Sequence, residues 1–161
     1  MLRLIGILAV AGASLYLCVA FTVFERRRLA QCEGFLMLVR HAAAQISCFR
    51  MPQGRIWESF ASEELERCGF LPVLREEGDF GRALEQTASR IWLSEEERSL
   101  LFAFGGELGR TLAEEQARAC EYYVGELEQA YRTRREEHPR RVRLYRSLFL
   151  TGGLMAVVLL L

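Results

Sequence analysis

Two long apolar stretches lie at the two ends of the chain, and a segment of mixed polarity separates them. The first runs from Leu4 to Phe24 without a charged residue, a length of 21 residues. As a helix it would measure about 31 Å, close to the roughly 30 Å of a hydrocarbon layer. Arginines at 26–28 follow it directly, as in a stop-transfer sequence. The pattern predicts an N-terminal transmembrane helix within residues 1–24. The alternative is a cleaved signal peptide, in which the apolar region is typically shorter and the positive charge precedes it.

The second apolar stretch covers residues 148–161 and contains no charged residue. A helix of this length would measure about 21 Å, which is short for a membrane span. An exposed helix of a soluble domain would have a polar face, whereas this stretch is apolar all round. We therefore expect a second transmembrane helix that thins the bilayer or pairs with the first. A buried terminal helix is the alternative.

Arginines mark the inner ends of both apolar stretches, at 26–28 and at 140, 141, 143 and 146. Positive residues close to membrane helices favour the cytoplasmic side, so residues 25–147 are expected to form a cytoplasmic domain. Such arginines also attract anionic membrane lipid. The formal net charge of the chain is zero, and the arginines lie beside the apolar stretches, so nucleic acid is not expected as a partner.

Apolar residues of the middle segment recur at spacings of three and four, which predicts helices. The first predicted helix continues beyond the membrane along a seam of Leu29, Cys32, Leu36, Val39, Ala43 and Ile46. Pro52 and Gly54 are expected to end it. A short helix is predicted over about 55–68, with Ile56, Phe60 and Leu65 turned inward. Gly69 suits the position after its C-terminus, and Pro72 suits a loop.

Capping residues predict where the later helices begin. Asp79 is a plausible N-cap for a helix whose apolar face runs to Ile91. Ser94 with Glu97 forms a capping-box pair for a helix reaching about Leu108, and Thr111 with Glu114 forms another for a long last helix. Pro139 is expected to interrupt or kink that helix. No segment alternates with period two for long enough to predict a strand, so the expected fold is an all-α cytoplasmic bundle flanked by two transmembrane helices.

The residue inventory argues against catalysis. The chain has no lysine and no asparagine, one aspartate and two histidines, His41 and His138. A phosphate-loop lysine and a Schiff-base lysine are therefore excluded. The five cysteines form no CxxC pair, and His41 has no second ligand at metal-binding spacing, so it is interpreted as structural. We expect no catalytic residue, no metal and no cofactor.

The segment from Leu100 to Arg110 contains three glycines, but it lacks the lysine of a phosphate-binding loop. We interpret Gly105 and Gly109 as allowing close packing or a tight turn between two helices. In the same segment, Leu101, Phe104 and Leu108 share one helical face, whereas Phe102 points away from it. Exposed aromatic rings often mark contacts, so Phe102 is a candidate partner-binding residue. The alternative is that another helix or the loop near Phe70 covers it.

An apolar stretch at each end, a helical middle and one specific motif together resemble stage III sporulation protein AB of endospore-forming bacteria. The motif comprises Phe104, Gly105, Leu108 and Gly109, followed by Gln116. Pro52 also matches the family pattern, although Met51 and Gln53 beside it depart from the family's usual Thr-Pro-Leu. Leu112 stands where the family usually has an acidic cap residue, and Thr111 offers an alternative cap. The resemblance covers essentially the whole chain.

The resemblance implies a function that composition does not. The family is similar to inner-membrane platform proteins of type II secretion and type IV pilus machines. The resemblance implies that this chain is a non-enzymatic component of the channel between mother cell and forespore. It also implies a location in the mother-cell membrane surrounding the forespore. The implied partners are other stage III sporulation channel proteins, including stage III sporulation protein AA, which looks like a secretion ATPase. A membrane-anchored sensor or adaptor and a membrane enzyme are the alternative functions.

Overall fold

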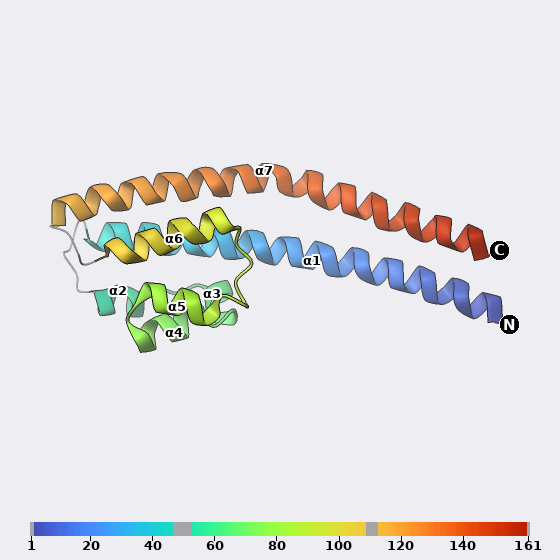
Figure 1. Ribbon diagram of the computed structural model, residues 1–161, viewed down its shortest axis with the longest axis horizontal. Helices are drawn as coiled ribbons and strands as arrows, with labels where there is room; N and C mark the ends of the chain where they lie inside the picture. The colour runs from blue at the N-terminus through green and yellow to red at the C-terminus, as the bar shows by residue number, and fades with distance from the viewer. Residues whose placement is uncertain (1, 47–52, 109–112, 161) are drawn as a thin grey trace. The chain divides into compact units, whose positions relative to one another are not determined.

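The computed structural model describes residues 2–46, 53–108 and 113–160, and in these ranges the regular structure is entirely helical (Figure 1). This confirms the all-α prediction. The helices are α1 (Leu2–Ala44), α2 (Gln53–Ser59), α3 (Glu63–Arg67), α4 (Phe70–Glu77), α5 (Phe80–Thr87), α6 (Glu95–Glu107) and α7 (Ala113–Leu160). They form two compact units. The terminal unit comprises residues 1–27 and 134–161, and the central unit comprises residues 28–133.

A chain of aromatic rings forms the centre of the central unit. Phe35 of α1 packs edge-on against Phe70 of α4 with ring centroids 4.8 Å apart, and Phe70 packs against Phe80 of α5 at 5.3 Å. Phe80 contacts Phe104 of α6 at 5.4 Å, and Phe104 contacts Tyr123 of α7 at 5.9 Å. Edge-to-face pairs of this kind add to the stabilisation from burial. One continuous contact path thereby joins helices that are distant in sequence.

The predicted seam is confirmed at Cys32, Leu36, Val39 and Ile46, which are buried. The other two predicted positions, Leu29 and Ala43, are partly buried. The buried surface is wider than that seam. Phe35, Leu38 and Ala42 are also buried, and contacts with Leu65 of α3 and Phe70 of α4 show that short helices cover a second face of α1. A helix that is buried on more than one face no longer shows a single apolar stripe.

The segment predicted as one short helix consists of two, α2 and α3, separated by residues 60–62. The physical reason is Arg75 of α4, whose guanidinium donates to the carbonyl oxygens of Trp57 at 3.3 Å and of Phe60 at 2.7 Å. These bonds satisfy carbonyl groups at the end of α2 that have no partner within the helix. The predicted inward residues Ile56, Phe60 and Leu65 are buried.

Pro72 lies in the first turn of α4, so the prediction of a loop there is wrong. Backbone N–H groups in a first turn have no intrahelical partner, and proline therefore costs little at this position. Gly69 directly before α4 has φ of 83°, a conformation that L side chains rarely adopt. The prediction that Gly69 follows a helix C-terminus is confirmed.

Both caps that fall on described residues are confirmed. Asp79 accepts a hydrogen bond from the Arg82 backbone N–H at 2.8 Å, and Ser94 with Glu97 completes a capping box at the start of α6. Thr111 lies outside the described residues. The helix begun at Asp79 ends at Thr87, before the predicted Ile91. Beyond it, Gln31 of α1 binds the loop by donating to the Arg90 carbonyl and accepting from the Trp92 N–H.

The terminal unit consists of the first part of α1 and the last part of α7, which run antiparallel (Figure 1). Phe21 of α1 lies 4.0 Å from Tyr145 of α7 between ring centroids. Pro139 was predicted to interrupt or kink the last helix. Because Pro139 lies inside α7, it does not interrupt the helix. Pro139 is exposed, and solvent can satisfy the carbonyl group that its missing N–H leaves without a donor.

Within the described residues, α1 is the one helix long and apolar enough to cross a membrane, over Gly6–Ala44. The residues from 148 onward belong to α7, but a second membrane span there is not confirmed. The terminal unit nevertheless presents an apolar surface. Apart from Met37 and Tyr122, all exposed large apolar side chains of the described residues belong to this unit.

Candidate functional site

Three cysteines of the central unit, Cys32, Cys68 and Cys120, are buried. The Cys32 Sγ donates to Glu97 Oε1 at 3.4 Å, and the Cys68 Sγ donates to the Leu65 carbonyl at 3.4 Å. Burial raises the pKa of the Cys68 thiol. Burial and the nearby Glu107 carboxylate raise the pKa of Cys120 to about 11. Because the thiolate is the nucleophile, the raised pKa values make the thiols of Cys68 and Cys120 poorly reactive at neutral pH.

His41 has a structural environment. Its Nε2 atom lies 2.9 Å from Ser59 Oγ, and its ring lies 5.4 Å from that of Phe60. The Ser59 hydroxyl donates to the Ile56 carbonyl at 3.0 Å, so the Nε2 of His41 acts as the donor to Ser59. Within the described residues, no group of three or more His, Cys, Asp or Glu side chains is arranged to hold a metal ion.

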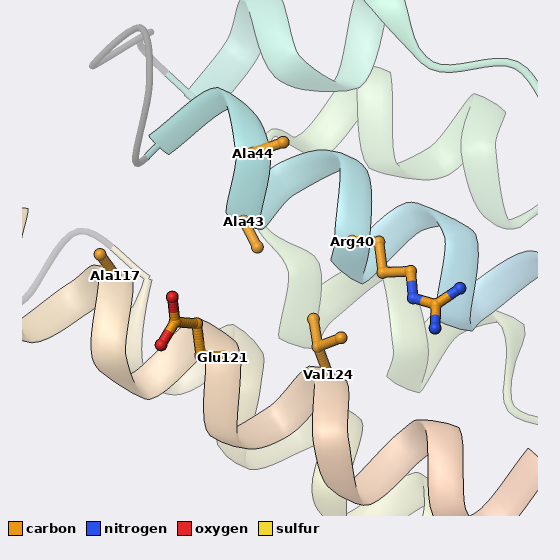
Figure 2. Close-up of a pocket in the computed structure, with 6 residues that line it drawn as sticks. All are labelled: Arg40, Ala43, Ala44, Ala117, Glu121 and Val124. Carbon is orange, nitrogen blue, oxygen red and sulfur yellow. The ribbon is translucent and has the colours of Figure 1, made fainter.

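A groove lies between α1 and α7 in the central unit (Figure 2). It has a volume of about 260 Å³ and is lined by Arg40, Ala43 and Ala44 of α1 and by Ala117, Glu121 and Val124 of α7. The small alanine side chains leave the space between the helices, and Val124 adds to the apolar lining. A groove of this shape suits an apolar side chain or a helix face of a protein partner.

Charged side chains lie along the rim of this groove. The guanidinium of Arg40 contacts Glu128 at 2.5 Å, and that carboxylate also contacts Arg132 at 2.5 Å. Hydrogen bonds from Arg40 and then Arg132 lower the pKa of Glu128. Glu121 is exposed and points toward the groove from α7 (Figure 2). The rim therefore offers charges of both signs, which favours a specific protein segment over a purely anionic or purely cationic ligand.

Three residues of the sequence motif meet at the α6–α7 junction. Phe104, Leu108 and Gln116 lie together with Cys120 and Tyr123 around a gap that is too small to hold a water molecule. Phe104 is buried and Leu108 is the C-cap of α6, so these residues have a packing role in the structure. The motif thus fixes how α7 begins against α6.

Gly105 does not form a turn, because it lies inside α6. A Cβ atom at this position would lie 2.9 Å from Cδ1 of Phe80, so Gly105 allows the close packing that was the other predicted alternative. Gly109 and Pro52 lie outside the described residues.

Phe102 is half-buried and packs against the edge of the core. A Cβ atom at Gly81 of α5 would come within 3.9 Å of its ring, so α5 covers part of this side chain. The ring is neither fully exposed nor part of the buried core. A contact with a partner at Phe102 stays a prediction.

Sequence reasoning missed the groove residues Arg40, Ala117 and Glu121. The Arg40–Glu128 ion pair joins residues 88 positions apart, and no local pattern connects them. The sequence held one signal that could have identified Arg40 as a groove residue: it follows the seam position Val39 and therefore points outward from α1.

Comparison with known proteins identifies the family. The family model described as stage III sporulation protein AB matches residues 3–161. No curated protein and no solved structure matches the chain.

Proposed function

Because this chain belongs to the stage III sporulation protein AB family, we propose that it is a non-enzymatic membrane platform of the sporulation machinery. In this proposal the terminal unit inserts into the mother-cell membrane around the forespore. The central unit faces the cytoplasm and binds other stage III sporulation channel proteins. The contact with stage III sporulation protein AA, which would link a cytoplasmic ATPase to the channel, is part of the proposal.

The observation that carries the membrane role is the apolar surface of the terminal unit. Leu8, Tyr16, Leu154 and Met155 are each more than two-thirds exposed, with values of 71%, 73%, 67% and 72%. An apolar surface of this kind in water would favour aggregation, whereas lipid tails would cover it. The arginines at 26–28 and at 140, 141, 143 and 146 support a cytoplasmic central unit.

The α1–α7 groove supports the binding role. It combines an apolar lining with charges of both signs, and its walls come from two long helices that hold it in place. Burial raises the pKa values of the Cys68 and Cys120 thiols, so both are protonated at neutral pH. These features favour recognition of a protein over chemistry on a substrate.

Photo-cross-linking in sporulating cells tests this proposal. A photoreactive residue replacing Ala117 in the full chain should cross-link to another stage III sporulation channel protein. The same residue at Gln129, which is exposed on α7 but does not line the groove, serves as the matched control. Glu121→Arg should reduce the Ala117 cross-link by reversing a rim charge.

Three outcomes would overturn the proposal. Release of the full chain from membranes by alkaline carbonate would contradict membrane insertion. Equal cross-linking from Ala117 and Gln129, or cross-links to no channel protein, would contradict the binding role. Phe102→Ala supplies a second surface test, with partner capture expected to weaken by on the order of 1–2 kcal/mol. A loss of stability without a binding defect would assign Phe102 to the core alone.

A further inference from the structure

A second groove runs between the two helices of the terminal unit. It has a volume of about 410 Å³, within the range of roughly 300–1,000 Å³ that small-molecule sites occupy. Its lining comes from both helices: Leu15, Cys18, Val19, Thr22, Val23 and Arg26 of α1, and Val142, Arg146 and Leu150 of α7. The α1 residues recur at spacings of three and four, so the groove follows one face of that helix.

The body of the groove is apolar. Thr22 is the hydroxyl-bearing residue of its lining, and the Thr22 Oγ1 donates to the Cys18 carbonyl at 2.8 Å. The hydroxyl therefore needs no ligand. Leu15, Val19 and Leu150 remain largely exposed, at 61%, 56% and 51%. Within the terminal unit, nothing in the described residues covers these side chains, so an apolar chain can enter the groove from the side.

Positive charge is placed toward one end of the groove. Arg26 and Arg146 are both exposed, and no described acidic side chain forms an ion pair with either. The neighbouring carboxylate, Glu25, is buried and does not line the groove. The ring of Phe21 contacts that of Tyr145, the residue before Arg146. Arg146 therefore lies near the level of Phe21 along the axis of α1, a short distance from Arg26. Two long arginine side chains from different helices can thus reach one anion.

We propose that this groove is a binding site for one anionic phospholipid, with an acyl chain along Leu15, Val19 and Leu150 and the phosphate between Arg26 and Arg146. The combination of an apolar trough and an arginine pair at its end matches the two chemical parts of such a molecule. This inference rests on the proposed membrane insertion of the terminal unit. It adds a specific site to the general attraction between arginines and an anionic membrane surface.

Native mass spectrometry of the full chain in detergent tests the site, with phosphatidylglycerol as the probe. The variant Arg26→Gln/Arg146→Gln should bind phosphatidylglycerol about tenfold more weakly than the unchanged chain. The matched control is Arg27→Gln/Arg143→Gln, which removes the same charge from exposed arginines of the same unit that do not line the groove. The control should keep the affinity of the unchanged chain.

Three further arms separate the parts of the ligand. Val19→Trp keeps both arginines but fills the trough, and it should also weaken phosphatidylglycerol binding. Phosphatidylcholine should bind more weakly than phosphatidylglycerol, and inorganic phosphate at millimolar concentration should not compete. Effective competition by inorganic phosphate, or unchanged binding in Val19→Trp, would reduce the site to a simple anion site and overturn the proposal.

Equal losses in the two double variants would attribute lipid binding to diffuse charge and would also overturn it. Alkaline carbonate extraction separates this failure from failure of the proposed function. A chain that resists extraction but lacks groove-dependent lipid binding refutes the lipid site alone. A chain that carbonate releases refutes the membrane insertion on which the site depends.

Discussion

Adjacent glycines at the end of α6 allow a matched test of core packing. A Cβ atom added at Gly105 would lie 2.9 Å from Cδ1 and 3.2 Å from Cβ of Phe80, whereas one added at Gly106 would meet nothing within 4 Å. Phe80 is 3% exposed and is held by the rings of Trp57, Phe70 and Phe104. Its Cβ is close to the backbone, so it cannot turn aside as the end of a flexible chain could.

The expected magnitudes follow from this difference. Replacing a helical glycine by alanine stabilises a helix by up to about 1 kcal/mol, and both substitutions receive a similar gain. Overpacking a core by one methyl group costs about 1–3 kcal/mol, and only Gly105→Ala incurs that cost. We therefore expect Gly106→Ala to be neutral or stabilising. Gly105→Ala should be less stable than Gly106→Ala by about 1–3 kcal/mol.

The assay is thermal unfolding of the full chain in detergent, followed by tryptophan fluorescence, to which Trp57 beside Phe80 contributes. For a chain of 161 residues, each kcal/mol of difference between the two variants corresponds to about 2–4 °C in Tm. Equal Tm values for Gly105→Ala and Gly106→Ala would refute the reasoning, because they would show that Phe80 yields without cost. A higher Tm for Gly105→Ala would show that the space beside Phe80 is larger than the structure has it.

Three further predictions concern single groups. Because the pKa of Cys120 is raised to about 11, the stability that the protonated thiol contributes is complete below pH 9.0 and is lost as the pH rises toward 11. This alkaline loss is on the order of 1–2 kcal/mol. Cys120→Ser should reduce it, as measured by urea unfolding at several pH values. Asp79→Ala removes the acceptor for the Arg82 N–H and should cost about 1 kcal/mol, whereas Asp79→Asn should retain most of the stability, as measured by urea midpoints. Arg40 and Arg132 lower the pKa of Glu128, so the stability that this carboxylate contributes is present above pH 4.5 and is lost as the pH falls. Glu128→Gln should therefore flatten the dependence of Tm on acid pH. An unchanged acid profile in that variant would contradict the prediction.

Local sequence signals were sufficient for the features that neighbouring residues decide. Asp79 and the pair of Ser94 and Glu97 cap their helices through bonds within three residues, so spacing alone identifies both helix starts. The buried seam of α1 followed from apolar spacing, because one face of this helix points to the core along its whole inner half. The family motif and the apolar stretches were likewise visible without coordinates.

Tertiary contacts decided what local patterns could not. Arg75 reaches back to the Trp57 and Phe60 carbonyls and so separates α2 from α3, an interaction across 15 to 18 residues that leaves no periodic signal. Phe102 points away from the apolar face of its own helix, and the placement of α5 beside it decides that part of its ring is covered. The two grooves depend on residues from α1 and α7, which lie at opposite ends of the chain. Helix formation is local, whereas the space between two helices exists only after both have packed.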